Sequence, residues 1–257
     1  LLVGSYGTPG VALALTIAGS YAYVADSREG LRIIDIKNPE APQEVGSYNT
    51  PGVAYDVSIA GSYALLADWD RGLRVINIKN PSVPEEVGSY DTPSGAHGVT
   101  IAGSYAYVAD GDSGLRIINI KNPEAPYEVG SYDTPGTAYD VIVAGSYAYV
   151  ADRLSGLRII DIKNPSAPQE VGSYDTPGFA YDVTIAGSYA YVADHWALRI
   201  INIANPEAPQ EVGFYDTPGT AYEVTIAGSY AYVADSREGL RIINIENPEA
   251  PQEVGIG

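Results

Sequence analysis

Short apolar segments alternate with polar turn segments along the whole chain. All of the apolar segments are rich in Val, Ile and Tyr, which suit a pleated, half-buried surface. No segment has apolar residues at helical spacing. We therefore predict four strands in the stretch 180–219, and the same strands in its equivalents: residues 180–186, 189–194, 198–203 and 210–215.

The tetrapeptide AGSY sets a regular period. Its Gly recurs every 42 residues four times and then after 41, at positions 19, 61, 103, 145, 187 and 228. Repeats of this length that contain only strands are typical of β-propellers, whose blades are four-stranded antiparallel sheets. Six repeats account for the chain, starting near residues 12, 54, 96, 138, 180 and 221.

The segments between the strands contain turn residues. Gly-Ser between the first two strands predicts a two-residue hairpin with glycine at positive φ. Asn38-Pro39-Glu40-Ala41-Pro42 and its equivalents must be connections, because proline cannot donate to a strand ladder. Asp-Thr-Pro-Gly, as in residues 133–136, leads from the fourth strand into the next repeat.

The third strand is apolar on both faces. In LRIIDI (31–36), Leu31 and Ile33 lie on one face, and Ile34 and Ile36 on the other. Each sheet must therefore be covered on both sides. An open stack of sheets would leave two apolar ends in water, so we predict one all-β domain over 1–257, a six-bladed β-propeller of four-stranded antiparallel blades.

The third and fourth strands carry a resemblance to a known family. LRIIDIKNPEAPQEVGSY (31–48) resembles the LVIVD repeat, and similar stretches occur in all six copies. The resemblance implies a β-propeller and a secreted or surface protein of bacteria or archaea. Functions in that family are largely unknown, so the resemblance implies no catalytic residue.

The two ends of the chain both read as a fourth strand. LLVGSY (1–6) and QEVGIG (252–257) give seven such strands for six places. We predict that residues 1–6 close the ring as the outer strand of the sixth blade, beside residues 240–245. In the alternatives, the C-terminal strand takes this place, or the surplus strand pairs with another molecule. The last case predicts a structural building block that self-assembles by strand exchange or into a filament or lattice.

Charge and amino-acid composition argue against several classes of partner and chemistry. A net charge of −18, with only 14 Lys and Arg, argues against nucleic acid and anionic membranes as partners. The absence of Cys excludes disulfides, thiolate metal sites and thiol catalysis.

The absence of Met predicts a processed, excised or engineered piece. No apolar run reaches the roughly 18 residues of a membrane span, and removal of a signal peptide would leave a start of this kind. We expect an extracellular or cell-surface location.

The loop between the second and third strands varies most between copies. Variable loops on an invariant scaffold are typical of binding surfaces. These loops and the connections between repeats are expected on one common face, called the top face below. Tryptophan and arginine often dominate binding. Trp69 and Trp196 fall in blades two and five, opposite each other in a six-blade ring, although each could instead cap its own blade. The candidate binding residues are Trp69, Asp70, Arg71, His97, Arg153, His195 and Trp196.

Carboxylates recur at the start of the first strand. Oxygen ligands near a channel mouth suit a hard cation such as Ca²⁺, which is the only cofactor that the sequence indicates. In the structural alternative, the same carboxylates accept backbone N–H groups. The candidate metal ligands are Asp56, Asp140, Asp182 and Glu223.

Two charged positions are invariant. An Asp ends every second strand, and we predict that it caps a turn. An Arg occupies every third strand, and we predict a structural pairing with an acid of the adjacent blade. The positions are Asp26, Asp68, Asp110, Asp152, Asp194 and Asp235, and Arg32, Arg74, Arg116, Arg158, Arg199 and Arg241.

Catalytic motifs are scarce. The chain has two His, no Gly-x-Ser-x-Gly elbow and no phosphate-binding loop. Asp140 and Asp182 could form a glycosidase-like carboxylate pair, but both come from the repeat unit. We therefore predict a binding or scaffold module, not an enzyme, whose partner is a protein, a glycan or a second copy.

Overall fold

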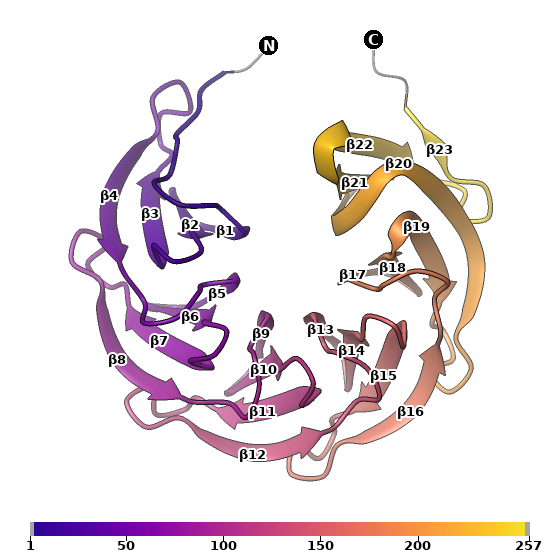
Figure 1. Ribbon diagram of the computed structural model, residues 1–257, viewed down its shortest axis with the longest axis horizontal. Coiled ribbons are helices and arrows are strands. Elements are labelled where there is room, and N and C mark those ends of the chain that lie inside the picture. Colours follow the sequence, from indigo (N-terminus) through magenta and orange to yellow (C-terminus); the bar gives the residue numbers. More distant parts are fainter. Residues whose placement is uncertain (1–2, 255–257) are drawn as a thin grey trace. The chain divides into compact units, whose positions relative to one another are not determined.

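The computed structural model describes residues 3–254, which form strands joined by short turns (Figure 1). The first sheet holds β1 (Ala14–Ala18), β2 (Tyr21–Ala25), β3 (Leu31–Asp35) and β4 (Gln43–Tyr48). The second holds β5 (Asp56–Ala60), β6 (Tyr63–Ala67), β7 (Leu73–Asn77) and β8 (Glu85–Tyr90). The third holds β9 (Gly98–Ala102), β10 (Tyr105–Ala109), β11 (Leu115–Asn119) and β12 (Tyr127–Tyr132).

The remaining two sheets follow the same order. The fourth holds β13 (Asp140–Ala144), β14 (Tyr147–Ala151), β15 (Leu157–Asp161) and β16 (Gln169–Tyr174). The fifth has seven strands: β17 (Asp182–Ala186), β18 (Tyr189–Ala193), β19 (His195–Asn202), β20 (Gln210–Ala227), β21 (Tyr230–Asp235), β22 (Leu240–Asn244) and β23 (Gln252–Glu253). Strand β20 runs without a break from the fifth repeat into the sixth, so one sheet contains two blades.

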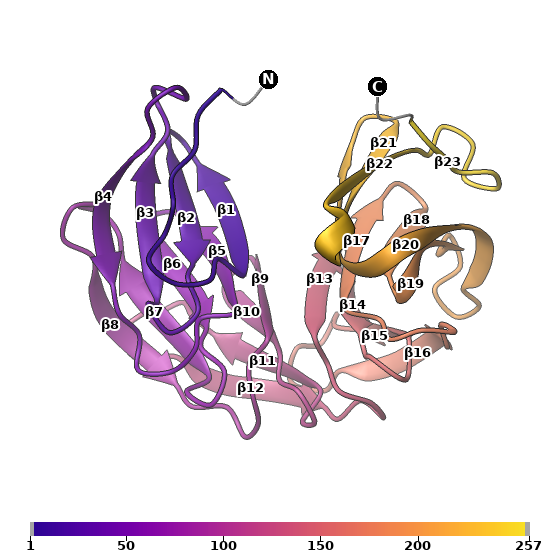
Figure 2. The same cartoon turned by 45° about the horizontal axis from the view of Figure 1, so that its top comes forward.

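The chain forms two compact units. The first contains the described residues up to Gly111 together with Arg116–Val129, and the second contains Asp112–Leu115 and the residues from Gly130 onward. In each sheet the strands lie side by side in chain order, as Figure 2 shows for β1 to β4.

The predicted hairpin is confirmed. Ala18 pairs with Tyr21 across a two-residue turn, and Gly19 has φ of 62°. The third and fourth strands also pair antiparallel, with a bulge at Val45. Local turn chemistry therefore sets the register of each blade.

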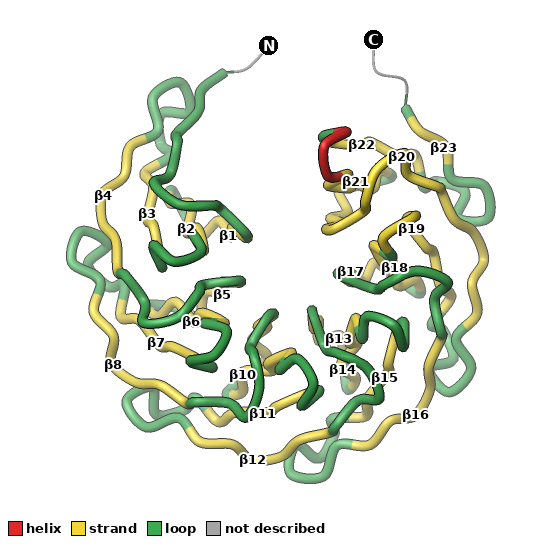
Figure 3. Tube along the Cα trace, viewed as in Figure 1, coloured by secondary structure: helices red, strands yellow, loops and turns green. Residues whose placement is uncertain are grey.

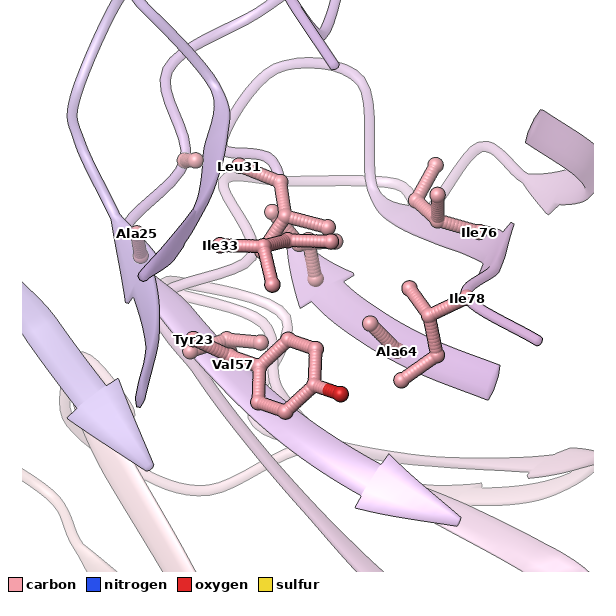
Figure 4. Close-up of a cluster of buried hydrophobic side chains, with 10 residues drawn as sticks. Tyr23, Ala25, Leu31, Ile33, Val57, Ala64, Ile76 and Ile78 are labelled. Atoms are coloured by element: carbon pink, nitrogen blue, oxygen red, sulfur yellow. The ribbon is translucent and has the colours of Figure 1, made fainter. Parts of the chain in front are cut away.

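Consecutive sheets bury the apolar faces predicted for the third strand. Figure 4 shows Leu31 and Ile33 of the first sheet packed against Val57, Ile76 and Ile78 of the second. Leu31 and Ile33 are fully buried. The second unit repeats this packing between its own consecutive blades.

The N-terminal segment docks on the first sheet without forming a strand. The Tyr6 hydroxyl donates to Glu44 over 3.1 Å, as Tyr48 donates to Glu86 over the same distance. The Thr8 hydroxyl donates to Asp26 over 2.6 Å. Residues 3–6 thus make the side-chain contacts of a fourth strand. Closure by residues 1–6 remains a prediction, and residues 1–2 and 255–257 lie outside the described residues.

At the other end, β23 takes the outer place beside β22. Gln252 pairs with Asn244, and Glu253 with Ile243. The only helical turn among the described residues is the 3-10 turn at Ser236–Glu238, drawn red in Figure 3. None of the described residues forms a helix long and apolar enough to cross a membrane.

Candidate functional site

The first residue of each variable loop has a left-handed backbone. This conformation is costly for residues other than glycine, by about 1 kcal/mol. Only the third repeat places a glycine there. The six positions and their φ angles are Ser27 (53°), Trp69 (43°), Gly111 (50°), Arg153 (45°), His195 (68°) and Ser236 (48°).

Backbone hydrogen bonds hold these positions against the next repeat. Trp69 and Ala96 exchange two bonds, of 3.1 and 3.0 Å, and Arg153 and Ala180 do the same. His195 pairs with Ala221 within β19 and β20. The variable loops and the inter-repeat connections therefore lie together, as predicted for the top face. Each variable side chain projects from a rigid point.

In the first unit, the predicted binding residues form separate pairwise contacts and not one cluster. Trp69 is 44% exposed and lies against Gly95 of the next repeat, where a β-carbon would overlap the indole. Asp70 and Arg71 form an exposed ion pair of 3.8 Å. His97 packs edge-on against Tyr55, with ring centres 4.9 Å apart. Trp69 thus partly covers the next repeat, whereas the structural alternative placed it over its own blade.

In the second unit, the predicted residues gather in a larger cluster. Arg153 and His195 lie around Phe179 and Tyr181, and Trp196 packs against His195 with ring centres 5.9 Å apart. Trp196 is 54% exposed. We call the following set the aromatic cluster: Tyr139, Arg153, Phe179, Tyr181, His195, Trp196 and Tyr222.

A shortened loop places His195 and Trp196. The fifth repeat has one residue fewer between Asp194 and Leu198 than the other repeats have at this point. The Trp196 N–H donates to the Asp194 carbonyl over 2.7 Å, which forms a tight turn. The turn extends β19 back to His195 and leaves the indole at the surface.

Four members of the aromatic cluster were not among the sequence candidates. Tyr139, Tyr181 and Tyr222 occupy an ordinary repeat position, so nothing in a single copy marks them. Phe179 carried a usable signal, because the equivalent residues of the other copies are Val, Thr or Gly.

The predicted metal ligands have another role. The Val183 N–H donates to Asp140 over 3.2 Å, and the Val224 N–H donates to Asp182 over 2.7 Å. In the first unit the Val99 N–H donates to Asp56 over 2.8 Å. Each carboxylate thus ties its strand to the first strand of the next repeat. Glu223, the fourth candidate, is exposed.

Among residues 3–254, no three acidic, His or Cys side chains form a group that could hold a metal ion. The Ca²⁺ prediction therefore finds no support in the described geometry.

Asp140 and Asp182 influence each other's protonation. Burial raises the pKa of Asp140, and burial together with the charge of Asp140 raises the pKa of Asp182 well above its usual range. Partial desolvation and the charge of Asp140 also raise the pKa of Glu223, although the residue keeps a large solvent-accessible surface. The folded chain therefore favours the protonated, neutral form of the Asp182 carboxyl over the ionised form.

Replacing Asp182 with Asn is expected to raise the free energy of unfolding at pH 7. Asn resembles the protonated acid and keeps an oxygen for the Val224 N–H. Because a raised folded-state pKa means that the folded chain holds the proton more tightly, the parent gains stability from this pair as the pH falls from 7 toward about 4.

Urea unfolding at pH 5, 6 and 7 measures this effect. The advantage of Asp182→Asn over the parent should shrink as the pH falls, whereas the exposed control Asp70→Asn should show no such trend. An advantage that is equal at pH 5 and pH 7 would contradict the assignment.

The invariant Asp and Arg form a buried structural network. In the second repeat, Asp68 accepts the Thr50 hydroxyl over 2.6 Å and the Gly52 N–H over 2.9 Å. It thereby fixes the connection that enters the repeat, which confirms the predicted capping role. Arg74 lies 3.8 Å from Asp68 and 3.7 Å from Glu86.

The predicted partner of the invariant Arg is wrong. Both Asp68 and Glu86 belong to the same blade as Arg74, not to the adjacent blade. The fourth-strand Tyr reaches the adjacent blade instead, where its hydroxyl donates to the Glu. A tyrosine can span this distance because the two blades meet along their outer strands.

Comparison with solved structures identifies the fold. The periplasmic gluconolactonase of Pseudomonas aeruginosa is similar with a TM-score of 0.82 and 16% identity, over 98% of this chain and 88% of that one. A protein from Lactobacillus plantarum is similar with a TM-score of 0.83 and 13% identity, over 95% and 84%. At such identities the likeness shows the fold alone.

A third similar structure is itself named for the fold. The β-propeller domain of Cps50 (Swd1) from Myceliophteria thermophila has a TM-score of 0.73 and 12% identity, over 90% of this chain and 81% of that one. Four-stranded antiparallel blades in six repeats, together with these likenesses, define this chain as a β-propeller.

The family follows from the repeats themselves. The LVIVD repeat model matches residues 9–50, 51–92, 94–134, 135–176, 177–217 and 218–256, so the chain belongs to the LVIVD-repeat family. No curated protein sequence matches the chain. The resemblance noted from the sequence is thus confirmed.

Proposed function

We propose that this protein is a secreted or cell-surface binding module that recognises a protein or glycan through its top-face loops. The observation that carries the proposal is the left-handed position that begins each variable loop. Glycine would relieve the strain, as Gly111 does, yet five repeats keep other residues there. A strained backbone conformation that is kept while the side chain changes from repeat to repeat is typical of positions selected for function.

The composition of the loops supports recognition. Trp, Tyr and Arg are the residues that most often dominate binding energy. The aromatic cluster gathers all three types, and Trp196 and Tyr222 are each at least half exposed. A rigid backbone beneath them lowers the entropic cost of binding.

A second candidate function is self-assembly. The observation that favours it is the surplus of fourth-strand segments. Residues 3–6 lie on the first sheet without forming a strand, and β23 already takes the outer place beside β22. A segment without a strand partner can pair with another copy of the chain.

A panel of immobilised glycans and extracellular proteins tests the binding function. We expect at least one partner whose affinity falls about tenfold or more in Trp69→Ala or Trp196→Ala. Tyr127→Ala is the matched control, because Tyr127 is 56% exposed on β12, away from the variable loops. Retained binding in both Trp variants, or no binding by the parent, would refute the proposal.

Light scattering on the same samples separates the two candidate functions. A monomeric parent with a Trp-dependent partner supports recognition and excludes self-assembly. Oligomers that persist in both Trp variants, with no external partner, support self-assembly instead.

A further inference from the structure

Arg153 differs from the other buried and half-buried arginines of residues 3–254 because it has no carboxylate partner. The invariant arginines of the third strands each contact carboxylates, as Arg158 contacts Asp152, Glu170 and Asp175. Arg153 is half-buried and forms no ion pair with a described carboxylate. This is notable in a chain with 32 Asp and Glu and only 14 Lys and Arg.

Aromatic rings, not acids, surround the Arg153 guanidinium. Its central carbon lies 5.5 Å from the Tyr139 ring centre and 5.2 Å from that of Phe179. Burial raises the pKa of Tyr181, and the nearby charge of Arg153 opposes this rise. The Nε atom is buried and has no hydrogen-bond partner. An unsatisfied buried donor costs about 1–3 kcal/mol, so the described residues leave this guanidinium incompletely paired.

Flat apolar surface continues beside this arginine. Tyr222 packs against Tyr181 with ring centres 5.1 Å apart and is 50% exposed. Trp196 extends the surface on the side of His195, whose Nδ1 atom is also buried without a partner. The site therefore joins one unneutralised cation to exposed aromatic faces.

We infer that the aromatic cluster binds the carboxylate of a small ligand with a flat apolar body. The inference rests on the proposed binding role of the top-face loops and goes beyond it, because a small carboxylate ligand is neither a protein nor a glycan. The carboxylate accepts hydrogen bonds from Arg153, whose planar fork matches a carboxylate. The flat body stacks on the exposed ring of Trp196 or Tyr222.

The charge of the chain limits the ligand to one or few negative groups. At physiological salt the electric field of each exposed charge is screened over about 8 Å, so Arg153 attracts an anionic group only when the two are nearly in contact. A polyanion would extend past this range and meet the field of a chain with net charge −18. A phosphate dianion generally needs more cationic groups than one arginine supplies.

Fluorescence of Trp196 reports binding directly when Trp69 is replaced by Phe. Benzoate is expected to change the emission with a Kd on the order of 1 mM, as suits a small ligand of few atoms. Uncharged benzyl alcohol should bind at least about tenfold more weakly because it cannot accept the bidentate contact. Inorganic phosphate should compete poorly.

Variants in the Trp69→Phe background assign the contacts. Arg153→Gln should weaken benzoate binding at least about tenfold, and Arg153→Lys should bind with intermediate affinity, because lysine keeps the charge and loses the fork. Tyr222→Ala should weaken binding if the body stacks there. Arg28→Gln, an exposed loop arginine in the first unit, is the matched control and should leave binding unchanged.

Several outcomes would overturn the inference. They are no response to benzoate up to tens of millimolar, equal binding of benzoate and benzyl alcohol, undiminished binding by Arg153→Gln, or phosphate binding tighter than benzoate. None of these outcomes contradicts the proposed function, which is supported independently if a glycan or protein binds and the binding depends on a Trp. Circular dichroism of each variant checks that the strands are intact.

Discussion

Replacing Asp152 with alanine is expected to destabilise the second unit by about 2–4 kcal/mol, because the change leaves the Thr134 hydroxyl and the Gly136 N–H without their acceptor and removes the buried carboxylate beside Arg158. Asp152 is fully buried and accepts the Thr134 hydroxyl over 2.6 Å and the Gly136 N–H over 2.8 Å. Arg158, 3.8 Å away, would lose its buried counter-charge.

Asp175→Ala is the matched control. Asp175 pairs with the same arginine over 2.6 Å, but its side chain is 76% exposed. Exposed ion pairs contribute at most about 1 kcal/mol, so this variant should resemble the parent. Urea unfolding followed by Trp196 fluorescence, in a Trp69→Phe background, measures the second unit. Equal losses for the two variants would show that burial does not govern the network.

Replacing Gly172 with alanine is expected to cost about 3 kcal/mol, near the upper end for overpacking. The β-carbon would overlap the backbone carbonyl oxygen of Pro206 in the next repeat. A backbone atom cannot rotate away as a side chain can, so β16 and the connection that carries Pro206 would have to separate. The invariant glycine of the VGSY segment is thereby explained by a close approach between repeats.

Two controls sharpen the Gly172 experiment. Ser173→Ala changes the neighbouring position of β16 and should alter stability by no more than about 0.5 kcal/mol. Gly4→Ala creates the same overlap with Pro39, but on a segment that forms no strand. Its cost should be about 1 kcal/mol or less, because the segment can detach while the blade stays folded. A full-size loss at Gly4 would mean that residues 3–6 are integral to the fold.

The stability network and the recognition surface use separate residues of the same loop. Asp152 ends β14 and fixes the chain, and Arg153 follows it directly and faces the aromatic cluster. A rigid anchor beside a variable side chain lets the repeat change its ligand without changing its fold. This arrangement would allow nearly identical repeats to carry the proposed binding site.

Much of the fold could be predicted from single repeats. The hairpin at Gly19 and Ser20 follows from local turn preferences, and the burial of Leu31 and Ile33 follows from side-chain alternation. Strand ends were less predictable. β20 continues through Asp216-Thr217-Pro218-Gly219, where the same residues predict a turn, because pairing with β19 and β21 keeps the chain extended.

The candidate site was only partly predictable. Variation between loops indicated Arg153, His195 and Trp196, and the structure brings these three together. Variation gave no hint that Phe179 joins them, since it lies in a different connection. For the acidic position the sequence left two roles open, because the residue type alone does not show whether a carboxylate meets a cation or a backbone N–H. Only the Val224 N–H, 2.7 Å from Asp182, distinguishes the two roles.

The sequence by itself determined the six repeats, the four strands of each, the tight hairpins and the family, because these depend on neighbours a few residues apart and on exact recurrence. Only the tertiary structure decided which acid pairs with each invariant arginine, why the VGSY glycine is required, and which side chains surround Arg153. Those outcomes depend on the distances between side chains of different strands and loops, where small backbone shifts decide which of several chemically suitable partners is reached.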